Sequence, residues 1–238
     1  MEFIPNQQKL EFDAPSHTYT FEGQKLTSVS NIIKQYSHPF DEDGSILAKK
    51  AAENGISIEE QRAAWKKINE DSIIRGNSFH KDLEIYIKTK KVADTHNKKI
   101  IKQFAKIKFK GKLYSEVRLF NLEFGIAGTS DILELMPDNS IRIWDLKSNK
   151  KLNTYSWGRK MKYPLNNYWD ANMYHYTIQL EIYKFMLEKA GWWVDNLTLL
   201  FIDPKTETLK QIPVQGRRED IIHLLNHYCR KKNNLQKF

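Results

Sequence analysis

The residues best suited to chemistry are an acid and a lysine two positions apart, Asp145 and Lys147, in the apolar segment 141–147. Side chains alternate along a β-strand, so in a strand these two project from the same face. Asp131 lies in the segment just before, and Pro-Asp-Asn-Ser at 137–140 is typical of a tight turn between strands. Two acids and a lysine on one hairpin could hold a hard divalent cation beside a water, which is equipment for phosphodiester hydrolysis.

Asp131 and Asp145 meet in only one register of this hairpin. A two-residue turn at Asp138 and Asn139 pairs residues whose numbers sum to 277, which sends the two acids to opposite faces. A three-residue loop or a bulge gives a sum of 276 and places them opposite each other. A shared site therefore predicts the second register. The alternative is an ordinary ion pair of Asp145 and Lys147, but their apolar neighbours favour a buried strand, where charge is costly.

The surrounding pattern predicts the elements that would position these residues. Apolar residues recur every three or four positions over 173–190, which indicates a helix. Period-two patterns and turn residues indicate strands elsewhere in this half of the chain. The expected order is strands at 113–122, 124–135 and 140–147, a long connection at 148–172, the helix, strands at 197–203 and 209–214, and a basic amphipathic helix at 217–233.

The N-terminal part is expected to be mostly helical after a short hairpin. Residues 17–26 should turn at Glu22 and Gly23, and Ser28 or Ser30 could cap a helix that ends near Tyr36. The further expectations are a loop at 37–45, helix over most of 46–90 where Gly76 could break it, and a helix from Asn97 to about Lys108. This order predicts an α/β core with helical additions before it.

Size and composition limit the alternatives. The chain has 238 residues, which suits a single domain, with 1–69 as N-terminal hairpin and helices, 70–205 as core and 206–238 as C-terminal strand and basic helix. A formal charge of +9 favours a polyanionic partner such as nucleic acid, although solubility alone could explain it. Cys229 is the single cysteine, which excludes disulfides and cysteine-ligated clusters within one chain and fits a reducing, cytoplasmic setting. Neither a signal peptide nor a membrane-spanning run is expected.

Two further groups flank the acidic hairpin. His80 lies in the predicted helix, four residues after Gly76. Gln179 and Tyr183 lie four residues apart on the later helix and share a face. Each group is weak evidence by itself, because a lone histidine is usually an ordinary surface or core residue and the later pair could simply pack.

Taken in order, the four motifs resemble those of the PD-(D/E)XK nuclease superfamily, in particular its RecB-like branch of phage-type exonucleases and the mitochondrial genome-maintenance exonuclease. The motifs are Gly-x-x-x-His (76–80), Gly-Thr-x-Asp (128–131), Asp-x-Lys-Ser (145–148) and Gln-x-x-x-Tyr (179–183). The resemblance covers about residues 70–205. It implies a restriction-endonuclease-like core, a central mixed β-sheet flanked by helices, with N-terminal helical additions.

The resemblance also implies roles for single residues. His80, Asp131, Asp145 and the Leu146 carbonyl would bind one or two Mg²⁺ or Mn²⁺ ions, while Lys147 would position or deprotonate the attacking water. Glu116 matches a frequently acidic position and could assist. Gln179 and Tyr183 would contact DNA or brace the site. Ser148, and the loop residues Arg159 and Lys160, are further candidates for contact with DNA. Relatives with an iron–sulfur cluster use four cysteines, so no such cluster is expected here.

The implied activity is that of an exonuclease acting at single-stranded or duplex DNA ends, leaving 5′-phosphates, in phage or bacterial recombination, replication or repair. A structure-specific endonuclease of the same fold and an inactive nucleic-acid-binding module are the alternatives. The connection 148–172 supports a nucleic-acid partner, because it interleaves cations with aromatic rings that can stack on bases. Its basic residues are Lys150, Lys151, Arg159, Lys160 and Lys162, and its rings are Tyr155, Trp157, Tyr163, Tyr168 and Trp169. A solvated loop whose rings pack on the core is the other interpretation.

Overall fold

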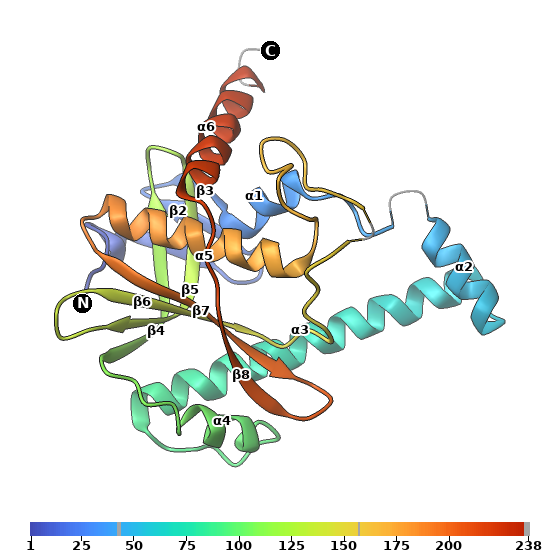
Figure 1. Cartoon of the computed structure of the whole chain (residues 1–238), viewed down its shortest axis with the longest axis horizontal. Helices are drawn as coiled ribbons and strands as arrows, with labels where there is room; N and C mark the ends of the chain where they lie inside the picture. Colours follow the sequence, from blue (N-terminus) through green and yellow to red (C-terminus); the bar gives the residue numbers. More distant parts are fainter. Residues whose placement is uncertain (42–43, 157, 236–238) are drawn as a thin grey trace.

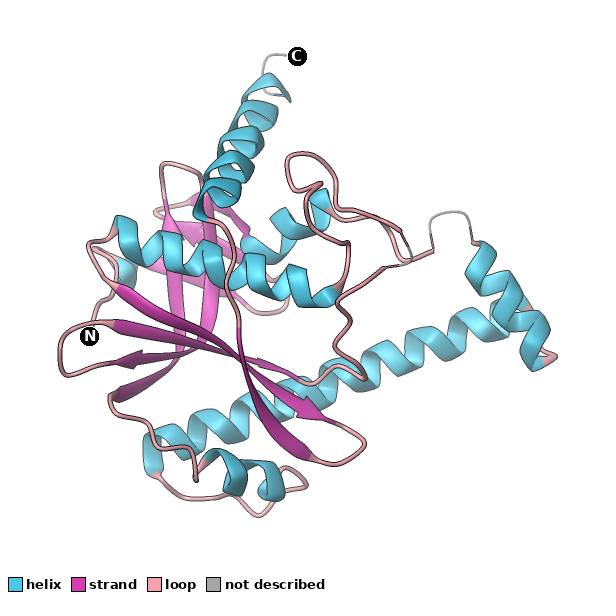
Figure 2. Ribbon diagram, viewed as in Figure 1, coloured by secondary structure: helices cyan, strands magenta, loops and turns pink. Residues whose placement is uncertain are grey.

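An eight-stranded mixed sheet with helices on both faces organises the chain in the computed structural model, which describes residues 1–41, 44–156 and 158–235 (Figure 1, Figure 2). The path of neighbouring strands is β1-β2-β3-β5-β6-β7-β8, and β4 pairs with β5. The β3–β5 and β6–β7 pairs are parallel. The strands are β1 (Leu10–Asp13), β2 (Thr18–Phe21), β3 (Gln24–Ser28), β4 (Lys112–Asn121), β5 (Ile126–Leu135), β6 (Ile141–Lys147), β7 (Val194–Asp203) and β8 (Thr208–Pro213).

The helices differ strongly in length and in their place relative to the sheet. A 3-10 turn, η1 (Gln7–Lys9), precedes β1, and the α-helices are α1 (Val29–Tyr36), α2 (Ser45–Asn54), α3 (Ile58–Thr89), α4 (Lys98–Phe104), α5 (Asn172–Lys189) and α6 (Arg218–Leu235). The first half of α3 extends away from the sheet and carries α2 at its end (Figure 1). No helix among the described residues is long and apolar enough to cross a membrane.

Alternation along the central strands creates two apolar cores, one on each face of the sheet. In β6, Ile141 and Ile143 join the core that also contains residues of α1, α5 and α6. The intervening Trp144 and Leu146 join a second core with residues of α3 and α4. Successive side chains of a strand point to opposite faces of the sheet, and both faces are covered here, so β6 contributes to both cores. Asp145 lies two positions after Ile143, so its side chain is on the same face of β6 as that of Ile143, toward α5.

The strand and hairpin predictions are confirmed. The three consecutive strands, the two later strands and the helices at 173–190 and 217–233 all occur with small shifts at their ends. The early hairpin turns at Glu22 and Gly23, both with positive φ, as a two-residue loop requires. Ser28 is the side chain that caps α1. Residues 42–43 of the predicted loop 37–45 lie outside the described residues.

Two helix predictions are wrong. Gly76 does not break α3, because a single glycine inside a helix costs only about 1 kcal/mol. The break lies earlier, where Gly55 ends α2 with a positive φ and Ser57 starts α3 with a capping box to Glu60. The helix from Asn97 ends at Phe104 rather than near Lys108.

The chain leaves this helix early because the buried Glu134 carboxylate binds the amides that follow it. Glu134 Oε1 accepts hydrogen bonds from the Lys110 and Gly111 amides at 2.6 and 2.9 Å. The N-terminal strands β1 to β3 join the sheet, and of the N-terminal elements only β1 and η1 were not predicted.

One edge of β5 forks, and the fork positions the candidate site. The other edge of β5 is paired with β4 along its whole length. On the forked edge, β3 pairs with Ile126 and Ala127, and β6 pairs with positions 132–135. Positions 128–131, which are Gly-Thr-Ser-Asp, lie between these two ladders with no strand partner on that edge among the described residues.

Candidate active site

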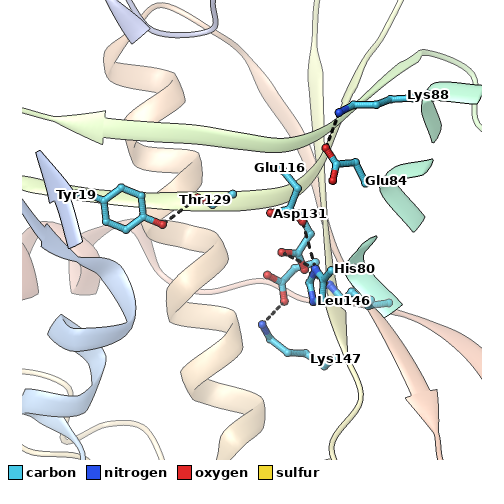
Figure 3. Close-up of polar contacts among 10 residues, drawn as sticks. Tyr19, His80, Glu84, Lys88, Glu116, Thr129, Asp131, Leu146 and Lys147 are labelled. Atoms are coloured by element: carbon cyan, nitrogen blue, oxygen red, sulfur yellow. Dashed lines mark hydrogen bonds and ion pairs between the residues drawn. The ribbon is translucent and has the colours of Figure 1, made fainter. Parts of the chain in front are cut away.

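His80, Glu116 and Asp131 form a cluster that could hold a metal ion. One ligand atom from each lies within 4.8 Å of the others. His80 Nδ1 is 3.3 Å from Glu116 Oε1 and 3.6 Å from Asp131 Oδ1. The three residues come from α3, β4 and β5, and Figure 3 shows their side chains converging. The sequence analysis gave Glu116 only an assisting role, whereas the geometry gives it a position equal to that of His80.

The strand registers explain why the acids meet. In the β4–β5 ladder, the pairs on either side place Glu116 directly opposite Asp131. The β5–β6 ladder has the predicted 276 register, and continuing it by one position places Asp131 opposite Asp145. The loop that sets this register has three residues, because Met136 and Ser140 still share a hydrogen bond and Asn139 has φ 64°. The prediction of a three-residue loop or bulge is therefore confirmed.

Asp131 lies at the point where β6 leaves β5. Its Oδ2 accepts a 2.6 Å hydrogen bond from the Leu146 amide, so a side chain replaces the backbone pairing that ends there. This bond holds Oδ1 toward His80. The Leu146 amide is thus the donor that orients Asp131, while the predicted role of its carbonyl as a metal ligand stays a prediction.

Glu116 adopts a strained backbone conformation in the middle of β4, with φ 51°. A left-handed conformation costs an ordinary residue roughly 1–2 kcal/mol. Carboxylates directly opposite each other in a sheet also repel, and this applies to Glu116 and Asp131. Backbone strain and like charge at one position both occur more often at functional sites, which favours a functional role for Glu116.

Asp145 and Lys147 form a buried ion pair beside this cluster. Their Oδ2 and Nζ atoms are 2.8 Å apart, and the Asp145 side chain is only 1% exposed. Neither Asp145 oxygen has a hydrogen-bond partner of good geometry, although Lys147 is close. The Lys147 ammonium also lies 4.7 Å from the centre of the Tyr176 ring of α5. The sequence analysis did not single out Tyr176, whose place in the apolar stripe gave no sign of this contact.

Burial and the electrostatic interactions among these groups shift their pKa values. Burial tends to lower the pKa of His80, but the Asp131 and Glu116 carboxylates outweigh it and raise the pKa to about 9. Burial raises the pKa of Asp145, against the pull of Lys147. Burial opposes the charge of Lys147, yet Asp145 and Asp131 raise its pKa above the usual value. Without a bound cation, His80 and Lys147 therefore both carry positive charge at neutral pH.

The donor set fits a divalent metal ion. Carboxylate oxygens suit Mg²⁺, and a neutral imidazole also suits Mn²⁺ and other transition metals. Asp145 Oδ1 is a buried acceptor with no donor, and Oδ2 has only the Lys147 ammonium beside it at 2.8 Å, so this carboxylate has acceptor capacity left for a metal ion. His80, Glu116 and Asp131 are the residues whose atoms already converge, and Asp145 adds its charge from the next strand.

Gln179 and Tyr183 of α5 brace the fork. Gln179 Nε2 donates a 3.0 Å hydrogen bond to the Tyr183 hydroxyl, and both side chains line the same cleft as His80 and Asp131. The Tyr183 ring lies against Gly128, where a Cβ atom would come within 2.6 Å of the ring. The glycine of Gly-Thr-x-Asp therefore permits close approach of α5 to β5.

The other predicted substrate-binding residues do not line the cleft that contains His80, Glu116 and Asp131. Ser148 is exposed and lines a second groove together with Arg75, Lys150, Phe40 and Trp65. The Arg159 guanidinium donates to the Pro39 carbonyl at 2.9 Å. Lys160 Nζ lies 3.6 Å from the centre of the Trp169 ring. Roles of these residues toward DNA stay predictions.

The aromatic rings of 148–172 have mixed environments. Tyr163 is 69% exposed and Tyr155 is 52% exposed. Tyr168 donates to the buried Asp220 and packs against the main core. Trp157 lies outside the described residues. Each interpretation of this segment therefore holds for part of it. Tyr163 and Tyr155 are largely exposed, whereas Tyr168 packs against the core.

A cleft of about 600 Å³ opens onto the metal-capable cluster. One side carries His80, Glu116 and Asp131, and α5 contributes Gln179 and Tyr183. The opposite side comes from the β1–β2 hairpin, whose Tyr19 hydroxyl hydrogen-bonds Thr129 of the fork at 2.9 Å (Figure 3). This hairpin wall was not predicted from the sequence, because its aromatic residues belong to none of the four motifs.

No protein-family model matches this chain, and no curated protein matches it either. Among the solved structures that are similar to it, two are each 18% identical. The crystal structure of SSO0001 gives a TM-score of 0.41 over 86% of this chain and 75% of that chain. The structure named "Putative exonuclease" from Eubacterium rectale gives 0.42 over 88% and 82%. Similarity this low says nothing about activity, so activity has to be argued from the site.

Proposed function

We propose that this chain is a metal-dependent nuclease that hydrolyses phosphodiester bonds in DNA through a single domain with a PD-(D/E)XK-type core. The observation that carries the proposal is the convergence of His80, Glu116 and Asp131 ligand atoms within 4.8 Å beside the Asp145–Lys147 pair. A bound Mg²⁺ or Mn²⁺ would lower the pKa of a water and neutralise charge that develops at phosphorus. These five residues are of the types that this chemistry needs.

The protein groups divide the work as follows. His80, Glu116 and Asp131 would hold the ion, with Asp145 and the Leu146 carbonyl completing the set. In the metal-free site the neighbouring carboxylates raise the pKa of Lys147, which favours a role as cationic stabiliser of the phosphate over a role as base. The Leu146 amide keeps Asp131 in orientation. The positive net charge of +9 would attract the DNA backbone.

Action at DNA ends is the form of the activity that we favour. The cleft is walled by the β1–β2 hairpin on the side away from His80, which favours a strand end over continuous duplex. A structure-specific endonuclease and an inactive binding module are the outcomes against which the test must discriminate.

The test is digestion of end-labelled DNA, single- and double-stranded, linear and circular, with Mg²⁺ or Mn²⁺. We expect degradation of linear DNA that requires the metal and is abolished by Asp145→Ala or Lys147→Ala. Lys210→Ala is a matched control, because Lys210 forms a 2.9 Å pair with Asp203 on an exposed hairpin. Full activity in either site variant would refute the assignment. Cutting of circular single strands would show an endonuclease, and binding without cleavage would show an inactive module.

A further inference from the structure

The wall of the cleft opposite the metal-capable cluster is built from aromatic rings. Phe12, His17 and Tyr19 come from β1, the turn and β2, and all three line the cleft. The Phe12 ring centre is 4.6 Å from that of Tyr19 and 5.3 Å from that of His17. Three rings of one short hairpin therefore form a continuous aromatic cluster.

The hairpin fixes this cluster to the candidate site. Tyr19 is buried, and its hydroxyl hydrogen-bonds Thr129, two residues before Asp131. His17 is exposed and has φ 50°, so the tight turn presents its ring at the rim. Phe12 is half-buried between them. The inner ring thus anchors the wall, and the outer two are accessible from the cleft.

Charge is distributed unevenly across the cleft. Its three lining acids, Glu84, Glu116 and Asp131, belong to α3, β4 and β5. The hairpin contributes no acid to the lining, and the lining residues next to it are Ser28 and Ser30 at the start of α1. A nucleotide could match this distribution. Its phosphate would lie toward a metal ion held by the acids, and its uncharged flat base would lie toward the hairpin.

We propose that the exposed ring of His17, supported by the perpendicular ring of Phe12, forms a nucleobase-stacking subsite, which holds the base of a nucleotide next to the scissile phosphate. This inference rests on the proposed function and specifies how its substrate is held. Stacking on aromatic side chains is tolerant of sequence, because every base has a π-face. The subsite therefore selects for an unpaired base rather than for one particular base, and an unpaired terminal nucleotide satisfies it.

The test uses a short single-stranded oligonucleotide in which one abasic residue is moved stepwise along the chain. We expect wild-type protein to cleave about tenfold less efficiently when the abasic residue occupies one position, mainly through a higher KM. His17→Ala and Phe12→Leu should remove this preference. Trp193→Ala is the control, because Trp193 is 71% exposed and does not line the cleft, so it should keep the preference.

A second measurement does not depend on cleavage. The same oligonucleotide with 2-aminopurine at the sensitive position, bound in EDTA, should lose fluorescence on wild-type and Trp193→Ala protein and lose less on His17→Ala. His17 is exposed, so its variant should fold even if Phe12→Leu does not. Metal-dependent cleavage with no sensitivity to a missing base would overturn the subsite and leave the nuclease intact. Absence of cleavage with any DNA, by contrast, would count against the proposed function.

Discussion

At the scale of single residues, the site holds more negative charge than its own cations balance. Glu116, Asp131 and Asp145 lie on adjacent strands in facing registers, and the cations that form ion pairs with them among the described residues are His80 and Lys147. Like charges at opposed positions destabilise a sheet. A divalent cation would relieve this repulsion, and a ligand that binds only the folded state stabilises it by mass action. The metal should therefore support the fold as well as the chemistry.

His80 makes the metal affinity depend on pH. Its pKa is raised from 6.5 to about 9 by Asp131 and Glu116, so folding gains stability from protonated His80 below pH 6.5 and loses it as the pH rises through 9. A metal ion binds the neutral ring, so binding releases this proton and Mn²⁺ affinity should increase by about tenfold per pH unit up to that pKa. Calorimetric titration at several pH values measures this, and His80→Gln should flatten the dependence. Equal affinity at both ends of the range would contradict it.

Glu116 should trade stability for function. Glu116→Ala removes the charge but keeps a side chain at φ 51°, whereas Glu116→Gly removes both sources of strain. We expect the glycine variant to be more stable than the alanine variant by about 1 kcal/mol, and both to lose metal-dependent activity. Urea unfolding of the metal-free proteins measures the difference. If alanine is the more stable of the two, the strain argument fails.

At the scale of elements, two glycines should respond oppositely to the same change. Gly128→Ala places a Cβ 2.6 Å from the Tyr183 ring, so β5 or α5 must shift at a cost of about 1–3 kcal/mol. Gly76→Ala has nothing closer than Ser148 Oγ at 3.9 Å and lies inside α3, so it should stabilise by roughly 0.5–1 kcal/mol. Thermal and urea unfolding of the two variants gives the comparison. Adding Tyr183→Leu to Gly128→Ala should recover part of the loss.

The elements also show which parts of the fold can be predicted from the sequence. Period-two and helical patterns predicted β4 to β8, α5 and α6, because those segments bury regular faces. The 276 register was predictable as a condition for Asp131 and Asp145 to meet. The fork of β5 was not, because it depends on β3 and β6 both reaching the same edge from distant parts of the chain. The prominence of Glu116 and the hairpin wall follow from the fork, so they too needed coordinates.

At the scale of the whole molecule, the net charge of +9 should make DNA binding strongly dependent on salt. The inactive Asp145→Ala protein allows binding without cleavage, and the logarithm of its binding constant should fall linearly with the logarithm of salt concentration. Lys150→Ala should reduce the slope by about 0.7 if Lys150 contacts a phosphate of a single strand. Lys205→Ala, on the β7–β8 turn, should leave it unchanged. Binding that ignores salt would contradict the electrostatic account.

The forked sheet has a further consequence for a cell that makes this protein. The groups at the fork come from positions 80, 116, 131 and 145, and the helix that closes the cleft follows at 172–189. A fragment that ends before α5 lacks part of the cleft, so a nascent chain of that length cannot assemble the whole site. Under the proposed function, we therefore expect nascent chains that end before α5 to be inactive on DNA.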